Sequence, residues 1–438
     1  MSANDRSPVN TLTAEAEPKS YEPEDLIQEK PVAPQLGEFP EGGKEATRVV
    51  WGAFLVLFVQ FGVMNSYGIF ESQYLADQLR TDTASSISWI GTFQLFTFFF
   101  AGAFIGRLFD SFGPTPLIVP GSILLVFGLM MTSLCKEYYQ FFLAQGLVFG
   151  IGSAMVFYPA LSAITHWYLK RRGTMMGLTT AGSSLGGVVF PIVLNKLIPA
   201  VGFPWAVRVV AFICLAFLIP AIYLIKGRLP RRQFAGFGSL LDFGGLKDPV
   251  YLLFLVGSFV TVLGTYNPYY YIETFAVAHN YSPNVYLYVL AIQNAGSFFG
   301  RVIPGIMADK LGFMNILALA CSGAALVLYT WLAVDSPAGL IVWAVAYGFT
   351  SGAFIALMPA CIGKITPDTT KYGGRAGLLF GFVSFAGLTG PPIAGALINH
   401  DGGNFRDMII FSGVVCTAGA CLFWAARFKF APGLFVKF

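Results

Sequence analysis

Charge is scarce in this 438-residue chain, because Asp, Glu, Lys and Arg together make up 11% of it. An ordinary soluble domain carries about 25% charged residues, so the composition excludes a water-soluble globular protein. Hydrophobic residues account for 55% of the chain. The formal net charge of +4 is small and does not indicate a nucleic-acid partner. The composition therefore predicts a polytopic membrane protein whose surroundings are a lipid bilayer.

Signatures of catalysis and of cofactors are also missing. The chain has three histidines and six cysteines, and the cysteines are scattered without a CxxC pair. This pattern favours packed thiols over a disulfide framework or a metal site. No GxxxxGK[ST] loop and no Ser-His-Asp constellation occurs in the sequence, so neither ATP-driven transport nor an embedded enzyme is favoured. We expect a protein that is not an enzyme and that holds no cofactor.

Long hydrophobic runs make up most of the sequence. A helix that crosses a bilayer needs about 20 apolar residues. Twelve runs meet this requirement, at 47–70, 86–108, 115–134, 139–162, 173–196, 205–226, 249–272, 284–308, 313–333, 338–362, 375–398 and 405–427. The sequence therefore predicts an all-α membrane protein with twelve transmembrane helices.

One long polar connection separates six of these runs from the other six. We expect two six-helix bundles at 47–226 and 249–427, joined by a cytosolic linker at 227–248. Residues 1–46 are poor in apolar side chains, which predicts a disordered cytosolic tail, and 428–438 form a short cytosolic tail. Two six-helix repeats are typical of transporters that bind their substrate between the halves.

Lysine and arginine are distributed unequally across the predicted membrane. If both termini are cytosolic, the cytoplasmic loops carry Lys170, Arg171, Arg172, Lys226, Arg228, Arg231, Arg232, Lys364, Lys371 and Arg375. The opposite loops carry little beyond Arg80, Lys136, Lys196 and Arg406. Positive charge favours the cytoplasmic side, so the sequence predicts cytosolic termini in a protein of the plasma membrane.

A charged turn occurs once in each half. Residues 106–113 read GRLFDSFG and residues 305–312 read GIMADKLG, so both follow the pattern GxxxDxxG. A carboxylate near a helix N-terminus, with arginines close by, can hold two helix bundles together in one state and release them in another. We therefore predict gating residues at Asp110, Arg107, Asp309, Arg171 and Arg172. The alternative is that the turns are merely solvated.

The eighth segment, which we expect to begin after Ser282, carries one full charge in its interior, Arg301. Asn294 and Ser297 share the helix face of Arg301, and Gln293 adjoins Asn294. A guanidinium is costly in hydrocarbon and persists where it faces a wet cavity or a partner. We predict that this face lines the substrate path. The structural alternative is that Arg301 bonds helix carbonyls or a polar neighbour.

Two further groups of polar side chains lie toward the outer side. Asn65 and Tyr67 end the first segment, and we predict that they contact substrate, with an interhelical hydrogen bond as the alternative for Asn65. Four tyrosines between 266 and 271 end the seventh segment. They form either an interfacial belt or a stacking surface for a ring-containing substrate. Glu273 follows them, as a proton site or as an exposed end residue.

Several motifs carry a family resemblance that covers about residues 41–430. The GxxxDxxG turns resemble the signature of the major facilitator superfamily. Two other stretches resemble the fungal branch of its monocarboxylate porter family. The first is Glu41-Gly42-Gly43, and the second runs from Tyr168-Leu169-Lys170-Arg171-Arg172 through Gly177 and Gly182. The chain departs from that pattern at Lys44, where tryptophan is expected, and in a methionine that replaces an alanine of the second run.

This resemblance implies roles for three residues. Arg301 matches the arginine that pairs with the substrate carboxylate, whereas Ser297 and Asn65 occupy the positions of an aspartate and a lysine that serve proton coupling. Two of the three charged groups are therefore neutral here, which argues against simple lactate uptake.

We predict a monomeric transport unit that moves a small organic acid or related metabolite by alternating access, leaning to efflux. The alternatives are a proton-coupled importer of a monocarboxylate or vitamin, and a non-transporting nutrient receptor. The sequence does not identify the coupling ion, and protons are one candidate.

Overall fold

The computed structural model describes residues 39–229, 241–366 and 372–431. These residues belong to one compact unit and form helices joined by turns, with no strand among them, which confirms the predicted all-α class. Residues 1–38, 230–240 and 432–438 fall outside the described part of the chain. The predicted tails and most of the predicted linker lie there, so those domain boundaries stay predictions.

The first half of the chain, residues 44–224, contains two π-helical stretches and one break within a long helix. Its helices are α1 (Lys44–Asn65), α2 (Tyr67–Gln73), α3 (Ala84–Phe112), α4 (Thr115–Thr132), α5 (Tyr138–Phe141), α6 (Gly150–Ile164) and α7 (Arg172–Leu224). Short π-helical stretches, Tyr74–Gln78 and Phe142–Phe149, continue α2 and α5. Within α7, Gly202 has a φ of 77°, a left-handed conformation that glycine adopts without strain. This break separates the fifth and sixth predicted segments.

The second half, residues 249–430, corrects one expectation. Its helices are α8 (Pro249–Thr265), α9 (Asn267–Ala278), α10 (Pro283–Tyr286), α11 (Val289–Leu311), α12 (Phe313–Thr330), α13 (Pro337–Ile365), α14 (Tyr372–His400) and α15 (Arg406–Phe430). We expected the eighth segment to be one helix from Ser282, and this is wrong because α10 ends at Tyr286 and α11 begins at Val289. The four residues of α10 bury no side chain. No packing therefore stabilises a continuous helix from α10 into α11.

The candidate membrane spans of the described residues account for eleven of the twelve predicted segments. Among the described residues, ten helical stretches are long and apolar enough to cross a membrane. The stretch Arg172–Leu224 holds two predicted segments, and α11 is the remaining one. Helix α11 is less apolar because it contains Arg301, Asp309 and Lys310. The most polar span is therefore the one that sequence analysis places on the substrate path.

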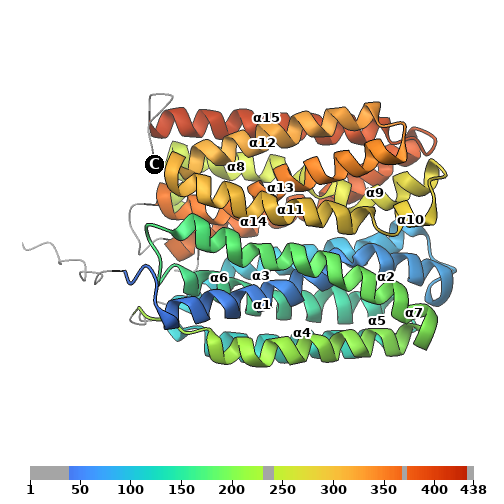
Figure 1. The fold of residues 1–438 in the computed structure, drawn as a ribbon, viewed down its shortest axis with the longest axis horizontal. Helices are drawn as coiled ribbons and strands as arrows, with labels where there is room; N and C mark the ends of the chain where they lie inside the picture. Colours follow the sequence, from blue (N-terminus) through green and yellow to red (C-terminus); the bar gives the residue numbers. More distant parts are fainter. Residues whose placement is uncertain (1–38, 230–240, 367–371, 432–438) are drawn as a thin grey trace, which may run out of the picture. The chain divides into compact units, whose positions relative to one another are not determined.

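The long helices run side by side, and two helix pairs join the halves (Figure 1). Helix α11 packs on α7, and α14 packs on α3. We call these contacts the α7–α11 seam and the α3–α14 seam. Glycines allow the close approach, because a Cβ at Gly177 would overlap the Arg301 carbonyl oxygen and one at Gly377 would overlap that of Ala103. The two seams bring both GxxxDxxG turns to the junction of the halves.

Candidate functional site

Arg301 lies inside the α7–α11 seam with 2% of its surface exposed. Its Nε donates to Ser297 Oγ at 3.2 Å, and its Nη1 donates to the Thr180 carbonyl oxygen at 3.1 Å and to Ser183 Oγ. No carboxylate of the described residues lies within ion-pair distance of the guanidinium. Arg301 therefore makes the structural contacts that the sequence left as an alternative, while its positive charge is not neutralised by a protein anion.

Ser297 connects this arginine to a second serine across the seam. The Ser184 hydroxyl donates to Ser297 Oγ at 3.2 Å, and both side chains are buried. Arg301, Ser297, Thr180, Ser183 and Ser184 thus form one buried group, which we call the seam cluster. Its α7 members were missed by sequence analysis, although serine and threonine recurring among the glycines of α7 were a signal. Hydroxyl groups of this kind can exchange partners when helices slide.

Asn294 and Asn65 meet beside the α7–α11 seam, further along α11, at the point where Asn65 ends α1. The Asn65 Nδ2 donates to Asn294 Oδ1 at 3.2 Å, and Asn294 Nδ2 donates to the Leu290 carbonyl at 3.0 Å. A Cβ at Gly187 would lie 2.6 Å from Asn294 Oδ1, so glycine leaves room for the pair. Asn65 and Asn294 were predicted separately as substrate contacts, and the structure brings them together. They meet through an interhelical hydrogen bond, which was the alternative interpretation of Asn65.

Gln293 is fully buried beside Asn294, and neither polar atom of its amide has a hydrogen-bond partner among the described residues. Its backbone oxygen is close to α13, where it would overlap a Cβ at Gly348. A buried amide without a partner is unfavourable unless water or a ligand satisfies it. This unsatisfied amide keeps Gln293 a candidate substrate contact.

A cavity between the halves has an empty volume of about 370 Å3. We call it the central cavity, and its lining residues are Phe61, Met64, Asn65, Tyr67, Gly68, Leu95, Tyr266, Tyr269 and Tyr270. Of the predicted substrate residues, the lining includes Asn65 and Tyr67. The others, Arg301, Asn294, Ser297 and Gln293, lie outside the lining. The predicted site is therefore divided between a cavity and a seam.

Three tyrosines of the seventh segment belong to this cavity. The hydroxyls of Tyr269 and Ser351 are 3.0 Å apart, and Tyr270 donates to the Gly91 carbonyl at 3.4 Å. Tyr67 donates to the Ile87 carbonyl at 2.6 Å, and its ring lies 6.2 Å from that of Tyr270. The hydroxyls of Tyr67, Tyr269 and Tyr270 are thus engaged by the protein and their rings are left to line the cavity, which favours the stacking surface over the interfacial belt.

Asp309, at the end of α11, binds the first turn of α7. Its Oδ1 accepts from the Gly173 N–H at 2.8 Å, and its Oδ2 accepts from the Thr174 N–H at 2.8 Å and the Thr174 hydroxyl at 2.6 Å. The first amides of a helix lack internal partners and carry partial positive charge, so they attract a carboxylate. We call this contact the Asp309 latch. Its donors are backbone amides and a hydroxyl, rather than the arginine side chains that we expected to assist.

Asp110 faces the first turn of α14 in a similar way. A Cβ at Gly373 would lie 2.8 Å from Asp110 Oδ2 and 3.8 Å from the Arg107 Cα. Both GxxxDxxG aspartates therefore approach the start of a helix in the opposite half. A second cavity, which we call the inner cavity, begins at Asp110 and has an empty volume of about 530 Å3.

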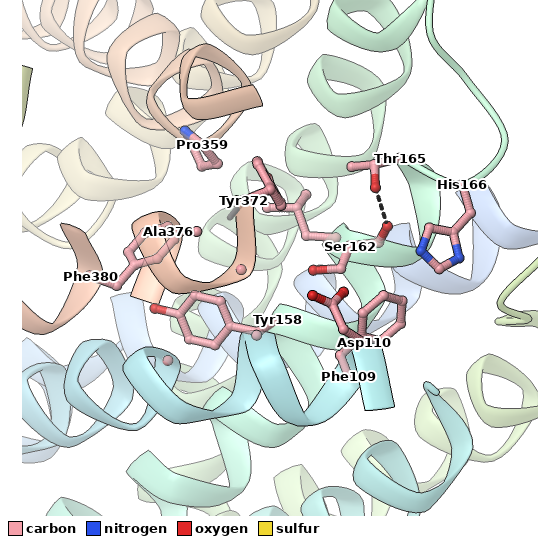
Figure 2. Close-up of a pocket in the computed structure, with 14 residues that line it drawn as sticks. Phe109, Asp110, Tyr158, Ser162, Thr165, His166, Pro359, Tyr372, Ala376 and Phe380 are labelled. Atoms are coloured by element: carbon pink, nitrogen blue, oxygen red, sulfur yellow. Dashed lines mark hydrogen bonds between the residues drawn. The ribbon is translucent and has the colours of Figure 1, made fainter. Parts of the chain in front are cut away.

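The inner cavity lies along the α3–α14 seam. Figure 2 shows side chains of α3 and α6, among them Phe109, Asp110 and Tyr158, across from Tyr372 and Phe380 of α14. Its full lining is Gly102, Gly106, Phe109, Asp110, Tyr158, Leu161, Ser162, Thr165, His166, Pro359, Tyr372, Gly373, Ala376 and Phe380. His166 accepts an N–H from Arg228 at its Nδ1, 3.4 Å away.

Arg171 and Arg172, two of the three predicted gating arginines, make contacts in different places. The Arg172 guanidinium lies 5.7 Å from the Tyr372 ring centroid, and its Nη1 is 2.6 Å from a Cβ built at Gly363. Arg172 therefore joins the start of α7 to α13 and α14. Arg171 is exposed, and its backbone N–H donates to a Glu41 carboxylate oxygen at 3.1 Å. Its contact is thus within its own half.

Gly305 and Gly106, the first glycines of the two GxxxDxxG turns, provide a matched pair of substitutions. A Cβ at Gly305 would lie 2.6 Å from the Gly173 carbonyl oxygen, a backbone atom that cannot rotate away, whereas a Cβ at Gly106 meets nothing closer than 3.7 Å. Gly305→Ala is expected to separate α7 from α11 and to cost about 1–3 kcal/mol, as overpacking typically does. Thermal unfolding of the purified variants and transport at equal surface expression measure both effects. Equal behaviour of Gly305→Ala and Gly106→Ala would show that the seam does not need this close approach.

Many membrane-spanning helices, two seams between the halves and a cavity between them are typical of membrane transporters in which one half moves against the other. The family model described as Major Facilitator Superfamily matches residues 53–337 and 254–432. The chain belongs to the major facilitator superfamily.

Relatives of almost the same length are fungal transporters. An MFS-type transporter of Aspergillus niger is 38% identical over 437 residues, 99% of this chain and 99% of the relative. The aspyridones efflux protein of Emericella nidulans is 39% identical over 406 residues, 92% of this chain and 82% of the relative. The agnestins efflux protein of Paecilomyces divaricatus is 37% identical over 392 residues, 90% of this chain and 89% of the relative. The predicted transporter of the superfamily is confirmed, and two of these relatives are named as efflux proteins.

Proposed function

We propose that this transporter exports a ring-containing organic acid or related secondary metabolite across the plasma membrane, with the central cavity as its binding site. The observation that carries the proposal is the lining of that cavity, where tyrosine and phenylalanine rings from both halves surround a single amide, Asn65. Such a surface suits a flat apolar body with few polar groups. The relatives named as aspyridones and agnestins efflux proteins support the direction of transport.

An acidic group on the substrate is supported by Arg301. The arginine is outside the cavity lining, but its helix face reaches the cavity through Asn294, which accepts a hydrogen bond from Asn65 of the lining. Because no carboxylate of the described chain pairs with Arg301, its field attracts negative charge toward the cavity. The proposed acid therefore binds with its ring among the tyrosines and its anionic group toward the seam cluster.

Gating is proposed to occur at the two aspartates. The Asp309 latch and the contact of Asp110 with the start of α14 join the halves at the end that the loop charges predict to be cytoplasmic. Opening that end requires both carboxylates to leave the helix starts, so each contact is bistable. We also propose that the chain belongs to the fungal branch of the monocarboxylate porter family, because it carries the Glu41-Gly42-Gly43 motif and the run from Tyr168 to Gly182.

A second candidate function is proton-coupled import of a monocarboxylate or vitamin. The observation in its favour is Glu273, whose Oε2 lies 3.7 Å from a Cβ built at Gly68 of the central cavity. A carboxylate at that position can carry a proton with the substrate.

Metabolite profiling of cells with and without the gene tests the direction of transport. Export predicts that one class of ring-containing compound accumulates inside deletion cells and disappears from the medium. Failure of deletion cells to take up a supplied acid or vitamin would instead establish import. Unchanged pools together with lost nutrient signalling would identify a receptor and refute the proposal. Reconstituted vesicles serve as the control, because a carrier accumulates the compound there and a receptor does not.

A further inference from the structure

The backbone N–H groups of one turn, residues 167–174, donate hydrogen bonds to two carboxylates that come from different parts of the chain. Glu41, which precedes α1, accepts from the N–H groups of Leu169 at 2.8 Å, Lys170 at 2.6 Å and Arg171 at 3.1 Å. Its own N–H donates to the Trp167 carbonyl at 3.2 Å. Four hydrogen bonds thus fix the start of the first helix to the turn that leads into α7.

The Asp309 latch uses the next amides of the same turn. Glu41 holds the N–H groups of residues 169–171, and Asp309 of the other half holds those of Gly173 and Thr174. Only Arg172 separates the two sets. The direction of each amide in so short a turn depends on the backbone angles of its neighbours, so the two carboxylates are mechanically connected.

We propose that Glu41 is a positioning residue of the gate, which sets the turn before α7 so that the Gly173 and Thr174 amides face Asp309. This inference rests on the proposed gating role of Asp309. Glu41 does not touch Asp309 and acts through the backbone. The strength of the latch, and with it the balance between the two states of the transporter, therefore depends on a residue outside the membrane-spanning helices.

The local backbone shows why the turn needs such support. Helix α7 has no side-chain cap of its own, and Arg171 at its N-cap position has the non-helical angles φ −104° and ψ 24°. A helix start without a cap frays readily. Glu41 itself has φ 53°, in the left-handed region that a non-glycine residue occupies only when its surroundings hold it there. Its four hydrogen bonds supply that constraint.

The charge of Glu41 is constant near neutral pH. Burial disfavours its charged form, but the N–H groups of Lys170, Leu169 and Arg171 outweigh this and hold the pKa of Glu41 below its usual value. The carboxylate bonds are therefore complete above the unfolded-state pKa and are lost only as the pH falls through the lower folded-state value. Glu41 acts as a fixed support rather than as a proton switch.

Hydrogen exchange of the purified full-length protein in lipid nanodiscs tests the proposal without any substrate. Glu41→Ala is expected to accelerate exchange at residues 169–171 and also at Gly173 and Thr174 by about tenfold or more, the change that follows from losing a charge-assisted hydrogen bond. Asp309→Asn is expected to accelerate exchange at 173–174 and to leave 169–171 protected. Glu41→Gln keeps an acceptor oxygen without the charge, so it should fall between wild type and Glu41→Ala.

Glu45→Gln is the matched control. Glu45 lies on the same segment but pairs with Arg48 at 2.6 Å and Lys226 at 3.6 Å, so its loss should leave the turn protected. Unchanged exchange at 173–174 in both Glu41 variants, with 169–171 accelerated, would overturn the positioning role while leaving the Asp309 gate intact. Unchanged exchange at 173–174 in Asp309→Asn would overturn the latch and this inference together. Glu41→Gln keeps the test decisive if Glu41→Ala does not fold.

Discussion

Replacing Arg301 with alanine is expected to abolish transport at normal surface expression. The substitution removes the unneutralised charge beside the central cavity and leaves Ser183, Ser297 and the Thr180 carbonyl without their shared donor. Each buried polar group that loses its partner costs about 1–3 kcal/mol, so the thermal stability should fall as well. Export of the compound found by metabolite profiling, measured per transporter at the surface, is the appropriate assay.

Two variants separate charge from stability. Arg301→Lys keeps the positive charge but loses the planar fork of donors, so we expect weak transport with a raised KM. Arg208→Ala removes another partly buried arginine, which donates to Ser133 Oγ at 3.1 Å and lies outside both seams, and its transport should be nearly normal. Transport by Arg301→Ala at the wild-type rate would show that the arginine is neither an anion site nor a necessary part of the seam.

Replacing Asp309 with asparagine is expected to lower the maximal transport rate by about tenfold or more. A carboxylate accepts all three donors of Gly173 and Thr174, whereas the asparagine NH2 group would face an N–H or O–H donor. Hydrogen bonds to a charged group contribute about 1.5–3 kcal/mol each, so the latched state should be strongly disfavoured. The apparent affinity should change less than the rate, because Asp309 is not part of the central cavity.

Rate and KM measured together test this expectation. Asp110→Asn provides the comparison, since Asp110 approaches the start of α14 as Asp309 approaches that of α7. A loss in both variants would support two latches that open together. A wild-type rate in Asp309→Asn would show that the latch is a static contact, outside the transport cycle. A large change in KM alone would place Asp309 in substrate binding and contradict its assignment to the gate.

The two aspartates show how far a repeated motif can lead. The sequence predicted that Asp110 and Asp309 would reach helix starts, because GxxxDxxG occurs once in each half. It did not predict the donors at Asp309, since Gly173 and Thr174 are more than a hundred positions away along the chain. Two of the arginines expected beside the carboxylates, Arg171 and Arg172, directly precede these donors, but the contact is made by backbone amides and a hydroxyl.

The substrate residues show the same division. Helical periodicity placed Asn294, Ser297 and Arg301 on one face, and the structure presents that face to α7. The central cavity instead takes its rings from α1, α2, α9 and the junction of α8 with α9, a combination that no local pattern contains. The tyrosines near 266–270 therefore had two interpretations until the positions of the other helices were known.

The sequence by itself determined the membrane class, the long apolar helices and the positions of the unusual polar residues. These follow from local properties, because a bilayer requires long apolar helices and makes an interior charge conspicuous. The tertiary structure alone decided which polar groups meet. It paired Asn65 with Asn294, placed Asp309 on the first turn of α7 and surrounded Arg301 with oxygens of the other half. Such contacts depend on the close packing of helices that are distant in sequence, and small residues permit that packing without specifying the partner.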